Sequence, residues 1–377
     1  MKVIITTIKL SVLGLFSLFF LACEKQVEYS LTPEESVQEA DSLYYPGETW
    51  EEMCCETSER WSAEKLDNAY TYWKYLKTDA VVIIHKGRIV RRWGEYNRKF
   101  RIHSVRKSLL SAMYGKYVAD GTIDLDATLE DLNIDDVQTA EDPSLSLSEK
   151  QATVRMLLQA RSGVYHPAAY ETASMKANRP EREAYAPGTH WYYNNWDFNA
   201  LGTIFEQETG KGIYQAFKTD IADPIGMQHY NPETDGIYQS ESVSVHKAYT
   251  FNMSAMDMAR FGLLIARRGL WKDTQIIPEA WIDESTQSYS EAGTSGGYGY
   301  LWWVAVDGKH FSNMDNAPEG MITARGNGGQ VIAIVPDMDL VIVTRGNTYM
   351  GADHEVNYRE LGKGFMKIID AMPQENE

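Results

Sequence analysis

The stretch Ser104-Val-Arg-Lys-Ser-Leu-Leu-Ser-Ala-Met-Tyr114 is the most informative part of the chain. Its apolar spacing predicts a helix, and a helix places residues three apart on the same face. The hydroxyl of Ser104 and the amine of Lys107 would then lie about one turn apart, where a lysine can activate a serine as a nucleophile. Because this pairing occurs by chance in many helices, the prediction needs other parts of an acyl-transfer site.

Tyr193 and Asn195 are candidates for the second part of that site. A lysine serves as a base only when burial or nearby positive charge lowers its pKa from about 10.4, and a polar neighbour must shuttle the proton. The segment Tyr193-Asn-Asn195 follows Pro187-Gly-Thr189 and precedes a predicted helix, so both side chains are expected on a short loop. The alternative is an aromatic-rich segment that packs in the core.

The third part is predicted in Arg325-Gly-Asn-Gly-Gly-Gln330, directly before an apolar strand. The absence of side chains at Gly326 and Gly328 lets a substrate approach the main chain closely. One N–H from Asn327 or Gly328, together with that of Ser104, would form an oxyanion hole worth about 3 kcal/mol at the transition state. The alternative is a glycine-rich hairpin entry that binds no ligand.

Composition narrows the possible partners. The chain has 377 residues, 44% hydrophobic and 24% charged, which is enough to bury a large core. Its net charge of −17 argues against nucleic acid, because phosphate binding needs clustered Lys and Arg. No group of His and acidic residues has metal-ligand spacing, so we expect neither a metal nor a cofactor.

The N-terminus predicts export. Met1-Lys2 precedes an apolar run from Leu10 to Leu21, which suits a signal sequence better than a permanent transmembrane helix. One interpretation is a cleaved secretory signal in which Cys23 is incidental. The other is a lipoprotein, because Ala22-Cys23 resembles a lipobox. In that case Cys23 carries lipid and anchors the chain to the bacterial cell envelope, on its periplasmic or surface face.

Three regions are predicted along the chain. Residues 1–22 form the signal, 23–60 an acidic tether rich in Ser, Pro and Glu, and 61–377 the folded domain. Cys54 and Cys55 are adjacent, a spacing at which a mutual disulfide is strained, so we expect two free thiols.

Periodicity predicts an α+β fold. Strands near both ends of the domain suggest one antiparallel sheet built from both termini and flanked by helices, with a mainly helical insertion at about 116–240. The catalytic cleft would lie between the sheet and the helical insertion. The predicted strands are 80–85, 88–93, 330–335 and 340–344, and the predicted helices include 104–114, 152–160, 199–209 and a C-terminal helix with Leu361, Phe365, Ile368 and Ile369 on one side.

The motifs follow the order found in penicillin-recognising serine hydrolases, and the chain resembles their class C β-lactamase-like branch. That branch also holds DD-peptidases, esterases and 6-aminohexanoate-dimer hydrolases. The resemblance runs from about Lys77 to the C-terminus and implies the β-lactamase/DD-peptidase-like fold. Segments that match the family between the motifs are Ala152–Leu158, Pro224–Met227, Met253–Gly262 and Tyr298–Trp303.

The third motif departs from the family pattern. Penicillin-active members carry Lys or His, a variable residue and then Gly, and the cation recognises a substrate carboxylate. Alignment on Gly326 places Ala324 at the position of that cation. Arg325 is adjacent, but neighbouring side chains on a strand face opposite ways. The departure weakens the β-lactamase interpretation. The string Arg325-Gly-Asn-Gly-Gly-Gln330 instead resembles the 6-aminohexanoate-dimer hydrolase and esterase-like branch.

The resemblance implies an exported serine hydrolase that cleaves an amide or ester bond in a small molecule or peptide through an acyl-enzyme on Ser104. Lys107 and Tyr193 would act together as general base and acid, and which of them is the base stays open. Asn195 would orient Lys107 and the substrate carbonyl.

Four further residues are expected to shape the pocket, although each of the aromatic ones could instead belong to the core. They are Tyr165, Trp196, Trp303 (or its neighbour Trp302) and Arg325. Two other functions remain open. One is a β-lactamase or DD-peptidase acting on cell-wall peptides, and the other is a non-catalytic lipoprotein that binds cell-wall peptides with the same fold.

Overall fold

The computed structural model describes residues 43–53, 61–137, 144–314, 316–351, 356 and 358–373. The predicted signal, the lipid attachment at Cys23 and the thiols of Cys54 and Cys55 lie outside these residues. Within the described ranges, no helix combines the length and apolar character that crossing a bilayer requires.

An eight-stranded sheet runs through the folded unit in the order β2-β1-β13-β12-β11-β10-β9-β8, and each neighbouring pair is antiparallel. Strands from both ends of the chain pair directly, because β1 lies between β2 and β13. This confirms the α+β prediction. The bounds are β1 Ala80–His85, β2 Arg88–Gly94, β8 Ser290–Glu291, β9 Gly297–Tyr298, β10 Trp303–Val304, β11 Ile322–Gly326, β12 Gln330–Val335 and β13 Leu340–Arg345.

Two hairpins fix the register of the central strands. Lys86 and Gly87 join β1 to β2 with φ of 48° and 78°, as a two-residue turn that follows the strand twist requires. A short 3₁₀ turn at Pro336–Met338 joins β12 to β13. Both hairpins were predicted from the sequence and are confirmed.

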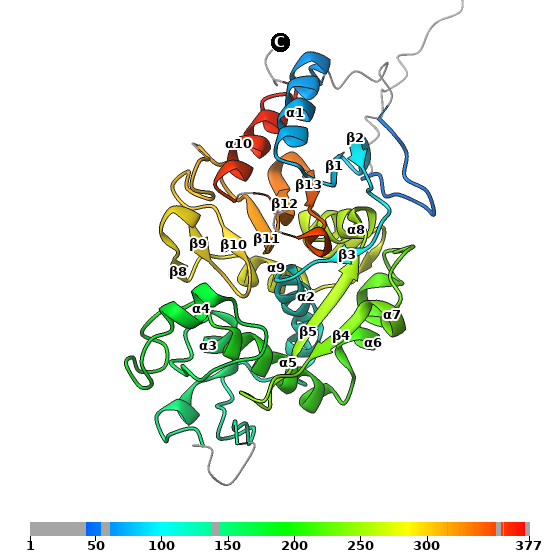
Figure 1. Cartoon of the computed structure of the whole chain (residues 1–377). Helices are drawn as coiled ribbons and strands as arrows, with labels where there is room; N and C mark the ends of the chain where they lie inside the picture. The colour runs from blue at the N-terminus through cyan, green and yellow to red at the C-terminus, as the bar shows by residue number, and fades with distance from the viewer. Residues whose placement is uncertain are drawn as a thin grey trace, which may run out of the picture. The chain divides into compact units, whose positions relative to one another are not determined.

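Helices cover both faces of this sheet (Figure 1). On one face, α1 (Ala63–Tyr75) and the predicted C-terminal helix α10 (Tyr358–Ile369) pack together, with the rings of Trp73 and Phe365 5.3 Å apart. On the other face lie α2 (Val105–Ala119) and α8 (Ala255–Ala266). Burial on both faces explains why the central strands are continuous apolar runs and do not alternate with polar residues.

The middle of the chain is mainly helical and also contributes a small three-stranded sheet in the order β3-β5-β4. The second face of α2 packs against this region. Its elements are β3 Phe100–Arg101, α3 Val154–Leu158, α4 Ala173–Asn178, α5 Asn195–Thr209, α6 Ile213–Phe217, α7 Pro232–Asp235, β4 Gly236–Gln239 and β5 Ala248–Met253. Between α8 and β8 lie β6 Leu270–Trp271, β7 Thr274–Gln275 and α9 Glu279–Ser285.

The folded unit starts earlier than the sequence predicted. Residues 43–53, expected in the tether, pack on the body of the protein. The hydroxyl of Tyr45 donates to the carbonyl of Leu270 at 3.2 Å, and the N–H of Met53 donates to Ile89 in β2 at 2.8 Å. The aromatic residues of this segment supply apolar area that its acidic composition concealed.

Candidate active site

Ser104 lies immediately before α2 and is the residue that caps the helix, but its side chain makes no capping hydrogen bond. Its backbone is already in the right-handed helical region, with φ of −74° and ψ of −7°. The hydroxyl is therefore not used by the helix. Instead, Oγ of Ser104 lies 3.0 Å from Nζ of Lys107, one turn further along α2.

Lys107 and Tyr193 form a buried pair beside this hydroxyl. Nζ of Lys107 lies 2.6 Å from the OH of Tyr193 and 4.4 Å from the ring centre of Phe198. Burial, and then the charge of Arg106, hold the pKa of Lys107 well below its usual value. Burial raises the pKa of Tyr193 to about 12. Both shifts favour the neutral forms of the pair, an unprotonated amine and a protonated phenol.

Asn195 differs from the sequence prediction. It does not lie on a loop but is the first residue of α5, because Asn194 caps the helix and accepts a hydrogen bond from the N–H of Trp196 at 3.2 Å. The side-chain N–H of Asn195 donates to the carbonyl of Tyr170 at 2.6 Å. Its buried Oδ1 has no hydrogen-bond partner among the described residues, which leaves an acceptor available beside Tyr193.

Strand β11 approaches the start of α2 at Gly326. A Cβ atom on Gly326 would lie 2.1 Å from the carbonyl oxygen of Ile102 and 3.1 Å from the backbone nitrogen of Ser104. A glycine is therefore required for the strand to lie against the serine. Asn327 and Gly328 belong to the turn between β11 and β12, and the positive φ of Gly328, 73°, fits that turn.

The two residues before Gly326 face opposite sides of the sheet. Ala324 is fully buried in the core on the α2 side. The backbone of Arg325 directs its side chain to the other side, where the guanidinium donates to the carbonyl of His310 at 2.6 Å and lies 3.9 Å from the ring centre of Phe311. The same guanidinium lies 4.7 Å from the ring centre of Trp303. On the Ser104 side, Ala324 therefore offers only a methyl group at the position where penicillin-active members of the family carry a cation.

The predicted pocket residues divide between the site and the core. The ring of Trp303 lies 5.5 Å from that of Tyr193, so it borders the site. Trp196 and Trp302 are fully buried. For Trp196 the expectation of a pocket residue is wrong, because its indole packs in the core and donates to Asp136 at 2.7 Å.

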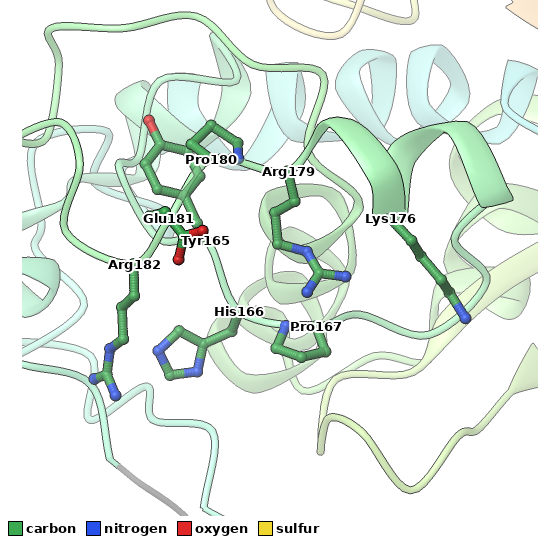
Figure 2. Close-up of a pocket in the computed structure, with 8 residues that line it drawn as sticks. All are labelled: Tyr165, His166, Pro167, Lys176, Arg179, Pro180, Glu181 and Arg182. Atoms are coloured by element: carbon green, nitrogen blue, oxygen red, sulfur yellow. The ribbon is translucent and has the colours of Figure 1, made fainter.

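Tyr165 lines a different pocket, of about 350 Å³, together with Lys176, Arg179 and Arg182 (Figure 2). Its ring lies 6.0 Å from that of Tyr192, the residue before Tyr193. The pocket thus adjoins the segment that carries Tyr193.

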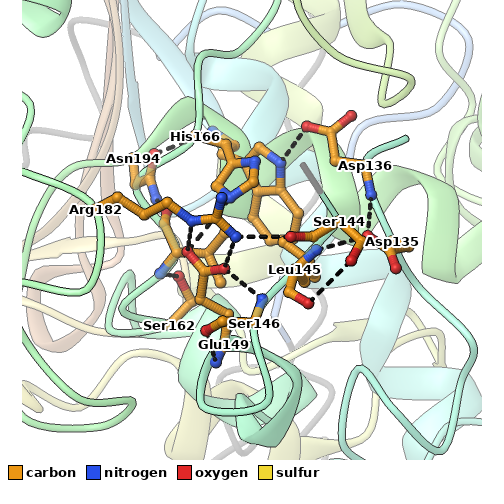
Figure 3. Close-up of polar contacts among 12 residues, drawn as sticks. Asp135, Asp136, Ser144, Leu145, Ser146, Glu149, Ser162, His166, Arg182 and Asn194 are labelled. Atoms are coloured by element: carbon orange, nitrogen blue, oxygen red, sulfur yellow. Dashed lines mark hydrogen bonds and ion pairs between the residues drawn. The ribbon is translucent and has the colours of Figure 1, made fainter. Parts of the chain in front are cut away.

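Carboxylates neutralise two of the cations in this pocket. Arg179 pairs with Glu171 at 2.6 Å, and Arg182 pairs with the buried Glu149 at 2.8 Å (Figure 3). Glu149 also accepts the N–H of Ser146 at 2.8 Å. These contacts give the arginines a structural role in holding the loop between α3 and α5.

Asp197 is a supporting residue that the sequence reasoning missed. It is fully buried on α5 and accepts hydrogen bonds from the hydroxyl of Ser162 at 2.5 Å and from the amide of Asn194 at 2.9 Å. It thereby joins the loop after α3 to the start of α5, directly behind Tyr193. An Asn followed three residues later by an Asp at a predicted helix start was the available signal.

His103, adjacent to the nucleophile, also has a structural role. Its φ of 49° places it in the left-handed region, so it precedes the helix and does not lie on it. Its ring nitrogens lie 2.8 Å from the hydroxyls of Tyr170 and Thr348, which come from opposite sides of the site. Burial and the charges of Arg101 and Arg345 lower its pKa to about 4, so it is neutral near pH 7.

Comparison with known proteins gives one family and several related folds. The Beta-lactamase family model matches residues 74–361. A segment of 66 residues is 35% identical to a D-aminopeptidase of Brucella anthropi, and this match covers 18% of the chain and 12% of that protein.

Three solved structures illustrate the fold. A Bacillus anthracis protein assigned as a 6-aminohexanoate-dimer hydrolase aligns with TM-score 0.58 and 20% identity, over 81% of this chain and 83% of that one. A class C beta-lactamase mutant aligns with TM-score 0.57 and 14% identity, over 82% of this chain and 98% of that one. The octameric penicillin-binding protein homologue of Pyrococcus abyssi gives 0.57 and 17%, over 83% and 78%. At these identities the likeness shows the fold alone.

Proposed function

Since the chain belongs to the beta-lactamase family, we propose that it is a serine hydrolase that cleaves an amide or ester bond through an acyl-enzyme on Ser104. The observation that carries the proposal is the position of one buried amine, that of Lys107, 3.0 Å from the hydroxyl of Ser104 and 2.6 Å from that of Tyr193. A nucleophile, a base and a proton carrier are thus in mutual contact.

The proposed reaction has two steps. Unprotonated Lys107 takes the proton of Ser104 as Oγ attacks the substrate carbonyl, and the N–H of Ser104 with one from Asn327 or Gly328 holds the oxyanion. The proton passes through Tyr193 to the leaving nitrogen or oxygen. Water then attacks the acyl-enzyme and gives a proton to the same pair, which returns it to Oγ of Ser104 as the carboxylic acid leaves.

The substrate preference follows from the side of β11 that faces Ser104. A cation that recognises a substrate carboxylate would have to lie at Ala324, and the guanidinium of Arg325 is held by the carbonyl of His310 and lies against the rings of Phe311 and Trp303. This supports ester or linear amide substrates over β-lactams and DD-peptides. The burial of Lys107 beside Ser104 and its lowered pKa support a catalytic role over simple peptide binding.

Labelling with a fluorophosphonate probe tests the proposal. We expect the probe to attach to Ser104 in the wild type and not in Ser104→Ala. The matched control is Ser111→Ala, because Ser111 lies on the same helix and its buried hydroxyl has no hydrogen-bond partner among the described residues. A wild type that stays unlabelled while it binds a cell-wall peptide would contradict the hydrolase. Faster turnover of a chromogenic cephalosporin than of a short-chain nitrophenyl ester would contradict the substrate preference.

We further propose that the protein is exported and attached to the bacterial cell envelope through lipid on Cys23. The support is the apolar run from Leu10 to Leu21 followed by Ala22-Cys23. Incorporation of radiolabelled palmitate into the expressed protein is expected for the wild type and lost in Cys23→Ala. Equal incorporation in both would contradict the anchor.

A further inference from the structure

Arg106, between the nucleophile and the lysine in sequence, is a buried cation that the proposed reaction does not use. Its side chain is fully buried, and Nη2 donates to Oδ1 of Asn199 at 2.9 Å. The guanidinium carbon lies 4.3 Å from the ring centre of Tyr249. Its Nε and Nη1 are buried without a hydrogen-bond partner among the described residues.

No carboxylate in the described part of the chain forms an ion pair with Arg106. A buried charge without a counter-ion is costly, since burial removes its hydration and nothing replaces it electrostatically. A neutral residue of similar volume would pack in this position more cheaply. The geometry therefore calls for a use of the charge itself.

Arg106 and Lys107 contact the same turn of α5. The guanidinium binds Asn199, and the amine of Lys107 lies over the ring of its neighbour Phe198. Tyr249 contacts Arg106 and Phe198, because its ring lies under the guanidinium and its hydroxyl donates to the carbonyl of Phe198 at 3.1 Å. In this dry environment two positive charges would repel strongly.

We propose that Arg106 is a positioning residue whose unneutralised charge keeps the amine of Lys107 unprotonated, so that it can accept the proton of Ser104. The proposal rests on the proposed function. Lys107 needs no further partner to stay neutral. The fixed positive charge of Arg106 in the same buried layer disfavours a second positive charge on Lys107. The lowered pKa of Lys107, due first to burial and then to Arg106, agrees with this geometry.

The charges that act on Lys107 and Tyr193 from the described residues are positive, those of Arg106 and Arg325. Arg325 adds to the positive field at Tyr193, and burial raises the pKa of Asp197 well above its usual value. His103 is neutral. The titratable or charged groups that face Lys107 and Tyr193 from the surrounding elements are Ser104, Arg106, Arg325, Tyr249 and Tyr298.

The test is the pH dependence of the rate at which a fluorophosphonate labels Ser104. Labelling requires an unprotonated base, so the rate should rise with pH to a plateau. In Arg106→Met we expect the midpoint of this rise to move up by roughly one pH unit, which means about tenfold slower labelling on its acidic side. Arg106→Lys keeps the charge and should restore the wild-type midpoint.

A second variant avoids removal of a buried side chain. Asn199→Asp has nearly the same shape and places a carboxylate against Nη2 of Arg106, so it should also raise the midpoint. Lys116→Met removes an exposed cation from the far end of α2 and should leave the midpoint unchanged. Thermal unfolding identifies the variants that are folded.

A midpoint in Asn199→Asp equal to that of the wild type would overturn the inference, as would a folded Arg106→Met that labels more slowly by the same factor at every pH. That second pattern is what a purely structural arginine would give. Failure of the wild type to label at Ser104 at any pH is a different result, and it would remove the proposed function itself.

Discussion

Replacement of Lys107 by methionine is expected to lower kcat/KM for a nitrophenyl ester by roughly 10³-fold at neutral pH. Methionine has nearly the same length and volume, so the buried space stays filled while the base beside Ser104 is removed. The rate is measured under conditions where the wild type gives a linear progress curve. Fluorophosphonate labelling of Ser104 should fall in parallel, because it depends on the same proton transfer.

Lys116→Met is the matched control for this change. It lies on the same helix, is half-exposed and pairs with Asp220 at the surface, so its loss should leave kcat/KM within about twofold. If Lys107→Met kept most of the activity while Tyr193→Phe abolished it, Tyr193 and not Lys107 would be the base. That result would also conflict with the pKa of about 12 that burial gives Tyr193.

The central sheet could be predicted because its signals are local. The runs at 80–84, 331–335 and 340–343 are continuously apolar, and the turns between their strands use residues suited to tight reversals. Strands β8, β9 and β10 contain two residues each, too few to produce a pattern. They depend on tertiary pairing, because β10 pairs with the edge of β11, β9 with β10, and β8 with β9.

The sequence predicted the residues proposed to react, but it did not predict the residues that hold them in position. Ser104 and Lys107 are close because a helix turn makes them so. Tyr193 is brought to Lys107 by tertiary packing, and only the order of the motifs indicated it. His103 is next to the nucleophile in sequence, but contacts with Tyr170 and Thr348 hold it in a left-handed conformation that sequence spacing does not reveal.

Trp196 shows most clearly that the sequence does not reveal the direction of a side chain. Its place beside Asn195 suggested a pocket residue, yet the first turn of α5 sends successive side chains in different directions. Asn195 turns to Tyr170, Trp196 to Asp136, and Asp197 to Ser162. Tyr170 and Ser162 both belong to the connection between α3 and α4, so Asn195 and Asp197 fix that connection at two points, whereas Trp196 fixes the segment that contains Asp136. The position of the phenol depends on these contacts and not on its own loop alone.

Asp197→Ala is accordingly expected to lower the free energy of unfolding by about 4 kcal/mol, because the hydroxyl of Ser162 and the amide of Asn194 would lose a buried acceptor and a cavity would form. Denaturant unfolding monitored by tryptophan fluorescence measures the loss. Asp223→Ala removes an exposed carboxylate paired with Lys218 and should cost less than about 1 kcal/mol.

Asp197→Asn separates shape from charge. Burial raises the pKa of Asp197 well above its usual value, so above about pH 4 the folded protein holds this proton more tightly than the unfolded chain. The contribution of Asp197 is therefore fully present below that pH and declines as the pH rises toward the raised pKa. Asparagine keeps the acceptor but does not titrate, so the stability advantage of the wild type over Asp197→Asn should shrink from pH 5 to pH 8. An advantage that grows over this range would show that Asp197 is held as a carboxylate.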